Sequence, residues 1–323
     1  YVADQEASRL LSPLLEAIRV GTSEERSLAM DALMKISDSS CISPLLSMSE
    51  TLTPFEKRKA EGVILHIGLK AVPSVINVLK DSSESYETRS MAARALSRLS
   101  FAQFDALFPR LIASEIEQAY RFLQNQAVLQ RQRSQDPGFT VLTLIYNDSR
   151  EEAVSFILEM LTLGGRLPDF ELLRASLRSD NPKERGNAIE TIEQGVSRDV
   201  FQKLLPLLDS RDFDDRVLAG HRFFPTIQEP SADDILDQAV NSPSALECAT
   251  AAQIIWDRKT DAQETLRQLL HQRSQLPFVR EILMSLLFRP VEHYELNLIE
   301  RIAALATGSF FPTYSIQELR SIA

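Results

Sequence analysis

The chain has 323 residues, of which 44% are hydrophobic and 25% are charged, and its formal net charge is −10. These values are ordinary for a folded soluble protein. The acidic balance argues against a nucleic-acid partner, because proteins that bind nucleic acid neutralise phosphates with Lys and Arg. The two cysteines, Cys41 and Cys248, form no CxxC motif. We therefore expect reduced thiols and a cytoplasmic location.

A basic residue followed three positions later by Ala recurs along the chain. The basic residues of this pattern are Arg26, Lys57, Arg89, Arg150, Arg185 and Arg216. Neighbouring copies are separated by about 31–35 residues or by close to twice that spacing, a period long enough for two helices and two short turns. The sequence therefore predicts a series of helix pairs.

Each pair is predicted to open with a helix that carries Pro near its first turn, where the missing N–H costs least. These prolines are Pro13, Pro44, Pro73 and Pro206. The turns "VGTSEE", "LTPFEK", "DSSESYE" and "SDNPKE" combine Ser, Thr or Asn caps with early glutamates. Such turns are typical of helix starts, so each is expected to begin a second helix.

The second helices are predicted to have one apolar face. In residues 26–36 this face comprises Leu28, Ala29, Ala32, Leu33 and Ile36, and in residues 89–99 it comprises Met91, Ala92, Ala95, Leu96 and Leu99. A single pair cannot bury such a face alone, whereas stacked pairs can. The predicted fold class is therefore all-α, an α-solenoid of stacked antiparallel helix pairs. Ala92→Leu should cost roughly 1–3 kcal/mol by overpacking, and Arg94→Ala, as a surface change, about 0.5 kcal/mol at most.

The spacing of the repeated pattern predicts that the chain has four parts. Residues 1–100 are expected to form N-terminal repeats and residues 101–168 irregular, longer helices, in which residues 101–134 make a helix pair. C-terminal repeats are expected over residues 169–307, after the Gly/Pro break "LGGRLPD". Residues 308–323 are expected to form a tail or the start of a following domain.

The Pro-Leu-Leu and Arg-x-x-Ala-x-x-Ala-Leu motifs resemble HEAT repeats of the phycobilisome-lyase-like type. The resemblance covers most of residues 7–225 and, more weakly, residues 231–289. It implies a HEAT-like superhelix.

Val141–Asp209 also resembles the HEAT segment fused to major-facilitator-type ADP/ATP nucleotide translocases of some bacteria. In those fusions a cyclic-nucleotide-binding domain often follows, and the last residues, "SFFPTYSIQELRSIA", resemble the entry to such a domain. This resemblance implies a soluble regulatory part of a bacterial nucleotide transporter, tethered to a membrane domain on its cytoplasmic side. The chain itself is not expected to insert, because no apolar run approaches about 18 residues.

The sequence contains no signature of catalysis. Phosphate-binding loops, zinc-ligand spacings and the GxSxG motif do not occur, and "DFDDR" lacks the glycine of a calcium loop. We therefore predict no catalytic, metal or cofactor-binding residue, no enzyme, and a non-catalytic scaffold for protein–protein or interdomain interaction. The alternatives are enzymes of the HEAT-like DNA glycosylase or bilin lyase type.

The recurring arginines are predicted to be structural. An acid at a turn and the Arg of the following helix would form a ladder between repeats, as in Asp81–Arg89, Asp180–Arg185 and Asp209–Arg216. Each such link contributes modestly unless it belongs to a network.

The positions five and nine residues after the basic marker vary in identity but share one helix face. They lie off the apolar stripe, and in HEAT stacks the second helices line the concave surface. We therefore predict a partner-binding inner face, although ordinary solvated positions are the alternative. The predicted residues are Asp31, Lys35, His66, Arg94, Arg98, Glu190, Gln194 and His221.

Overall fold

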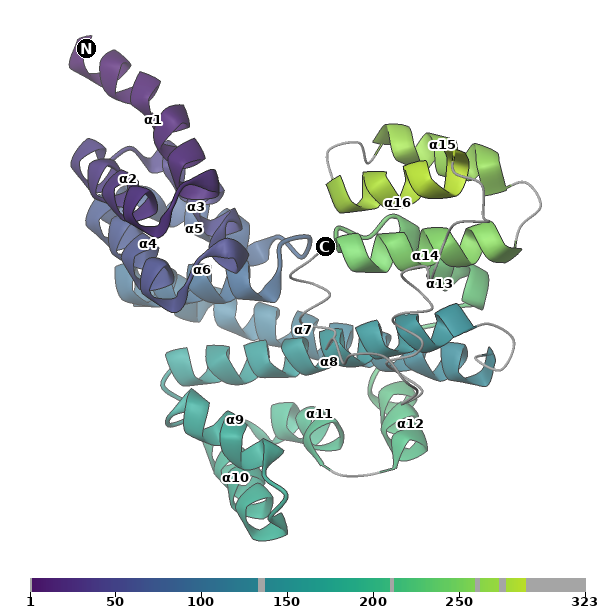
Figure 1. Cartoon of the computed structure of the whole chain (residues 1–323). Helices are drawn as coiled ribbons and strands as arrows, with labels where there is room; N and C mark the ends of the chain where they lie inside the picture. The colour runs from purple at the N-terminus through teal and green to yellow at the C-terminus, as the bar shows by residue number, and fades with distance from the viewer. Residues whose placement is uncertain (1, 133–136, 210–211, 259–261, 273–276, 289–323) are drawn as a thin grey trace. The chain divides into compact units, whose positions relative to one another are not determined.

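The computed structural model describes residues 2–132, 137–209, 212–258, 262–272 and 277–288 (Figure 1). Within these ranges every regular element is a helix and no strand occurs. The all-α prediction is therefore confirmed for this part of the chain. The predicted tail, residues 308–323, lies outside the described residues.

The chain divides into two compact units, which we describe separately. Unit 1 comprises Tyr1–Glu115 and Val154–Leu208, and unit 2 comprises Ile116–Ala153 and Asp209–Ala323. This division follows contacts in space, so the predicted parts 1–100, 101–168 and 169–307 stay a prediction.

Unit 1 contains eleven helices or parts of helices and three short 3-10 turns within the described residues. They are α1 (Val2–Val20), α2 (Ser23–Ile36), α3 (Ile42–Ser47), α4 (Pro54–Ile67), α5 (Val72–Lys80), α6 (Tyr86–Leu99), parts of α7 (Phe101–Gln132) and α8 (Pro137–Leu163), α9 (Phe170–Arg178), α10 (Pro182–Gly195) and α11 (Arg198–Leu208), with 3-10 turns η1 (Ser39–Cys41), η2 (Ser49–Thr51) and η3 (Gly68–Ala71). Helix α1 packs on α2, and α5 packs on both α3 and α6. Helix α2 packs on α4 and α4 on α6, so these three second helices are successive neighbours (Figure 1).

The predicted helix starts are confirmed. Thr22 and Thr53 begin α2 and α4 with capping boxes, in which Glu25 and Glu56 accept hydrogen bonds from the cap backbone. Ser85 and Asn181 also cap α6 and α10, but here only the side chain of the cap residue takes part, by accepting a hydrogen bond from a backbone N–H of the first turn. Each cap satisfies backbone N–H groups that the first helical turn leaves without partners.

The predicted prolines do not all begin helices. Pro44 and Pro73 lie in the first turns of α3 and α5, as expected. Pro13 and Pro206 instead lie inside α1 and α11, so the prediction is wrong at these two sites. The helices begin earlier than the proline pattern indicates, because upstream residues extend them. Residues 101–132, predicted as a helix pair, form the single 32-residue helix α7.

The apolar face of α2 is rotated from the predicted one. Ala29 and Leu33 are buried, but Leu28 is 62% exposed and Met30 is fully buried in its place. The reason is helical periodicity: residues 29, 30 and 33 meet on one side, whereas residue 28 lies on the opposite side of the helix axis from residue 30. In α6 the predicted face is correct for Met91, Ala92, Ala95 and Leu96. The Leu28 prediction is therefore wrong.

Two glycines of α10 should respond oppositely to substitution by Ala. A Cβ atom at Gly195 would lie 2.3 Å from the carbonyl oxygen of Arg166, whereas at Gly186 it would meet nothing within 4 Å. We expect Gly195→Ala to cost about 1–3 kcal/mol through overpacking and Gly186→Ala to add about 0.5–1 kcal/mol through helix propensity. Urea unfolding of both variants measures the difference. Equal effects would mean that the turn before α9 does not approach Gly195.

Unit 2 is built around the other halves of α7 and α8. Its further helices are α12 (Phe213–Phe223), α13 (Ala232–Val240), α14 (Ala245–Arg258), α15 (Ala262–Gln272) and α16 (Pro277–Phe288). Phe139, Tyr146 and Leu266 are among the buried core residues, and Trp256 packs against them. The buried Tyr120 ring lies 6.4 Å from the ring of Phe223 and 5.5 Å from that of Phe224, measured between centroids.

Among the described residues, one stretch is long and apolar enough to cross a membrane, by length and composition only. Residues 54–80 contain a window with a mean hydropathy of 1.6. The stretch is divided between α4, η3 and α5, and Ala60, Val63 and Ile64 within it are fully buried in unit 1. A buried core stretch of a folded protein passes the same test, so the observation is weak evidence for a span.

Candidate functional site

Five of the eight predicted partner-binding residues lie on three successive helices of unit 1. Asp31 and Lys35 belong to α2, His66 to α4, and Arg94 and Arg98 to α6. Because α2 packs on α4 and α4 on α6, the equivalent positions of the three helices adjoin one another. We call Asp31, Lys35, Gly62, His66, Arg94 and Arg98 the inner surface.

The other three predicted residues are not brought to this surface by any described contact. Glu190 and Gln194 lie on α10, which packs on α9 and α11. The Gln194 amide donates a hydrogen bond to the Glu190 carboxylate at 3.2 Å. His221 is exposed on α12 and belongs to unit 2. The arrangement predicted from the repeat is therefore realised in part.

An ion pair joins α2 to α4 at the inner surface. The Lys59 ammonium lies 2.8 Å from the Asp31 carboxylate and donates a hydrogen bond to the Ser27 hydroxyl at 2.6 Å. The Lys59 side chain is 18% exposed, and Asp31 is 45% exposed. This contact fixes the spacing of α2 and α4 with groups that still reach solvent.

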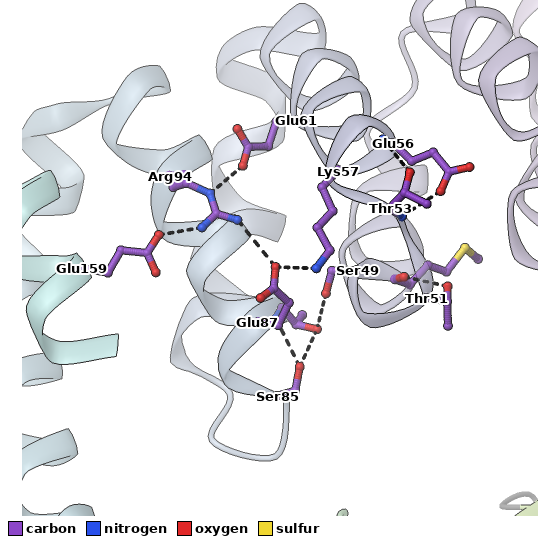
Figure 2. Close-up of polar contacts among 12 residues, drawn as sticks. Ser49, Thr51, Thr53, Glu56, Lys57, Glu61, Ser85, Glu87, Arg94 and Glu159 are labelled. Atoms are coloured by element: carbon purple, nitrogen blue, oxygen red, sulfur yellow. Dashed lines mark hydrogen bonds and ion pairs between the residues drawn. The ribbon is translucent and has the colours of Figure 1, made fainter. Parts of the chain in front are cut away.

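The equivalent contact between α4 and α6 is a larger network (Figure 2). The Arg94 guanidinium donates to Glu61 of α4 and to Glu159 of α8, both at 2.6 Å. Its second Nη lies 3.9 Å from Glu87, and Lys57 reaches the same Glu87 oxygen at 2.9 Å. Arg94 therefore links three helices of unit 1 through their side chains.

The structure shows that Arg94 is not a simple surface residue. Its side chain is 27% exposed, and those of Glu61 and Glu159 are 9% and 13% exposed. Burial by itself would lower the pKa of Arg94, but the Glu159 and Glu61 carboxylates outweigh it and raise the pKa. Charge-assisted hydrogen bonds of this kind are about twice as strong as neutral ones. The small effect predicted for Arg94→Ala must therefore be revised upward.

A second row of polar contacts lies along the N-terminal ends of the same helices. The Glu56 carboxylate accepts from the Thr53 N–H at 2.8 Å and from the Ser23 hydroxyl of α2 at 2.9 Å. The hydroxyls of Ser49 and Thr88 are 2.9 Å apart. The first contact joins α2 to α4, and the second joins η2 to α6.

The predicted ladder has different acidic partners. Arg89 forms a buried ion pair with Glu115 of α7 and donates to the Leu79 carbonyl at 3.2 Å. Asp81, its predicted partner, instead accepts from the hydroxyl and N–H of Ser83. Glu115 displaces Asp81 because α7 brings its carboxylate against α6. No described contact joins Asp180 to Arg185, and the pair Asp209–Arg216 stays a prediction.

The residues that sequence reasoning missed are the partners of the predicted ones. Lys59 and Glu61 hold Asp31 and Arg94, and Glu159 joins from α8. A signal was available: Glu61 and Arg94 have opposite charge and are 33 positions apart, which is about one repeat. Two exposed apolar side chains, Leu28 on α2 and Phe55 on α4, were also missed. Leu28 was predicted to lie on the buried face, and no prediction was made for Phe55.

The Glu56 contacts predict a pH-dependent contribution to stability. Burial alone would raise the pKa of Glu56, but hydrogen bonds from Thr53 and Ser23 together with Arg26 lower it. A lowered pKa means that the carboxylate stabilises the fold above the unfolded pKa of about 4, and that this is lost as the pH falls through the folded pKa. Glu56→Gln should therefore cost about 1 kcal/mol at neutral pH and much less in acid.

Urea unfolding near pH 7 and near pH 3 tests this expectation. Glu50→Gln is the control, because Glu50 is exposed on η2. An equal loss at both pH values would show that the Glu56 contacts do not depend on its charge.

Two observations on the described residues concern metal binding and thiol chemistry. Among them, no three His, Cys, Asp or Glu side chains are grouped to hold a metal ion. Cys41 is fully buried, and burial, together with Asp38, raises its pKa to about 11, so it is a neutral thiol at pH 7. The inner surface presents paired and unpaired charges on three helices of unit 1.

Comparisons with known proteins give no relative. No protein-family model, no curated protein and no solved structure matches the chain. The HEAT and translocase-fusion resemblances therefore stay predictions, and the functional argument rests on the chain's own residues.

Proposed function

We propose that the chain is a non-catalytic helical-repeat scaffold that binds another protein or a neighbouring domain through the inner surface of unit 1. The supporting observation is a repeated contact. Helices α2, α4 and α6 pack in succession, and Asp31–Lys59 and Glu61–Arg94 join them at the same side. Repetition of this kind produces an extended surface of rigid helices, which repeat proteins use for binding.

The proposal includes a finer statement about architecture. Unit 1 would be a short α-solenoid of HEAT-like helix pairs, with α2, α4 and α6 lining its inner side. The resemblance of Val141–Asp209 adds a context, in which the scaffold is the soluble regulatory part of a bacterial nucleotide transporter. No observation on the described residues favours the DNA glycosylase or bilin lyase alternatives.

Site-specific photocrosslinking in cells tests the proposal. A benzophenone amino acid replaces His66, which is exposed on the inner surface, or Gln103, which is exposed on α7. We expect a discrete protein crosslink from position 66 and none from position 103. The crosslink should disappear when Arg98, on the neighbouring helix, is replaced by Glu. Crosslinks of equal yield from both positions would contradict a specific surface.

A further inference from the structure

We infer that the inner surface takes an acidic, amphipathic peptide segment of a partner protein, and that this segment crosses α4 at Gly62. The inference rests on the proposed function and specifies the chemistry of the partner. Three independent features of unit 1 support it: a glycine in the middle of α4, two exposed apolar side chains on α2 and α4, and exposed cations to which the described contacts give no acidic partner.

The first feature is Gly62, which has no side chain. It lies in the interior of α4, where glycine weakens a helix relative to alanine. A Cβ atom at this position would meet nothing within 4 Å, so packing inside unit 1 does not require glycine. Arg58 and His66, one turn to either side, are exposed. Gly62 therefore leaves the helix backbone open between two side chains, where a partner can approach closely.

The apolar part of the surface comes from α2 and α4. Leu28 is 62% exposed and Phe55 is 61% exposed. Lys59 contacts α2 at Ser27 and Asp31, so Leu28 lies next to this contact. Phe55 lies one turn before Lys59 on the same side of α4. Two large apolar side chains thus lie exposed on α2 and α4, with Phe55 about two turns before Gly62, and both can be covered by apolar groups of a partner.

The charges left over on this surface are positive. The carboxylates of Asp31, Glu61 and Glu159 are each held in an ion pair within unit 1. Lys35 and Arg58 are exposed, and the described contacts give them no acidic partner. The Arg98 side chain is 60% exposed, and its guanidinium lies 3.5 Å from the Glu61 carboxylate. Against these stand two exposed carboxylates in the first turn of α2, Glu24 and Glu25, of which Glu25 accepts hydrogen bonds from the N–H and the hydroxyl of Thr22. A partner rich in carboxylates therefore complements the surface.

A peptide fits these features better than a nucleic acid or a membrane does. The paired carboxylates of Asp31, Glu61 and Glu87 lie among the cations and would repel a run of phosphates. A bilayer surface is broad, whereas the opening at Gly62 is one residue wide and flanked by Arg58 and His66. A peptide side chain or backbone matches an opening of that size.

Selection from a displayed library of random linear peptides, with the 323-residue chain as bait, tests the inference. We expect the enriched peptides to combine Asp or Glu with Leu, Ile or Phe. The dissociation constant of a synthetic enriched peptide should rise by at least about tenfold in Gly62→Leu. The variant should fold, because its new side chain has open space, and its melting temperature shows this.

Gly186→Leu is the matched control. Gly186 is also a helical glycine with nothing within 4 Å of its Cβ position, but it lies on α10. We expect this variant to bind the peptide as the wild type does. Lys35→Glu should also weaken binding, and a charge-reversed peptide, with Lys at its acidic positions, should not bind.

The other outcomes overturn the inference in distinguishable ways. Enriched peptides that bind Gly62→Leu as tightly as wild type would leave the scaffold proposal intact but place the site elsewhere. Enrichment of basic peptides would reverse the charge argument. Preferential binding of oligo(dT) or of phosphatidylglycerol vesicles, abolished by Gly62→Leu, would assign the surface to a nucleic acid or a membrane. The absence of any enriched peptide would contradict the inference, whereas the scaffold proposal is contradicted only by the crosslinking result described above.

Discussion

Arg89→Ala is expected to lower the free energy of unfolding by about 3–5 kcal/mol, the usual cost of breaking a buried ion pair. The Arg89 and Glu115 side chains are 4% and 5% exposed. The substitution leaves the Glu115 carboxylate buried without its counter-charge. It also removes the guanidinium that lies 4.8 Å from the centre of the Phe156 ring and donates to the Leu79 carbonyl. Urea unfolding at neutral pH measures the loss.

Two further variants test whether the loss of stability in Arg89→Ala comes from the buried, unpaired charge of Glu115. Arg19→Ala breaks an exposed pair with Glu16, and we expect no measurable change in stability. The double variant Arg89→Met/Glu115→Leu removes both charges and should recover much of the loss, because replacing a buried pair by apolar groups is often neutral. If Arg89→Ala cost no more than Arg19→Ala, α6 and α7 would not be held by this pair.

Arg94→Ala is expected to cost about 2–3 kcal/mol, because it leaves two partly buried carboxylates without their shared cation. Glu61 and Glu159 both bond to Arg94 at 2.6 Å, so they would also repel each other once it is gone. Ala92→Leu, at a fully buried site on the same helix, should cost about 1–3 kcal/mol by overpacking. The two effects should therefore be comparable.

Arg98→Ala provides the control for this prediction. Arg98 is more exposed and contacts Glu61 at 3.5 Å, so its removal should change stability little. Thermal or urea unfolding of the three variants gives the order of severity. A loss for Arg94→Ala as small as that for Arg98→Ala would show that the network in Figure 2 does not form in solution.

Local features of the fold were predictable from the sequence. Thr22, Thr53, Ser85 and Asn181 begin helices as the capping patterns predict, because the signal and the structure involve the same few residues. The apolar face was correct for α6, where its residues are consistently small or apolar. It was wrong at Leu28, because α2 has large apolar residues at positions 28, 30, 33, 34 and 36, which are spread over more than one side of the helix and so allow either of two overlapping faces to be buried.

Long-range partners were harder to predict. Glu115, rather than Asp81, pairs with Arg89 because the position of α7 against α6 depends on tertiary packing that no local pattern contains. Arg94 was expected to be solvated because its neighbour in space, Glu159, is 65 positions away. Position in the repeat was sufficient to bring Asp31 and Arg94 onto α2 and α6, which both pack on α4. It did not show which charges remain unpaired, and that is the property from which the partner's chemistry follows.

Hydroxyl-radical footprinting of the chain with an enriched acidic peptide tests the central claim most directly. Radicals oxidise exposed Leu and Phe side chains, and Leu28 and Phe55 are 62% and 61% exposed. We predict that peptide binding strongly reduces the oxidation of both. Leu172, which is 67% exposed on α9, should be oxidised as before. Protection of Leu172 with undiminished oxidation of Leu28 and Phe55 would contradict the assignment of the partner to the inner surface.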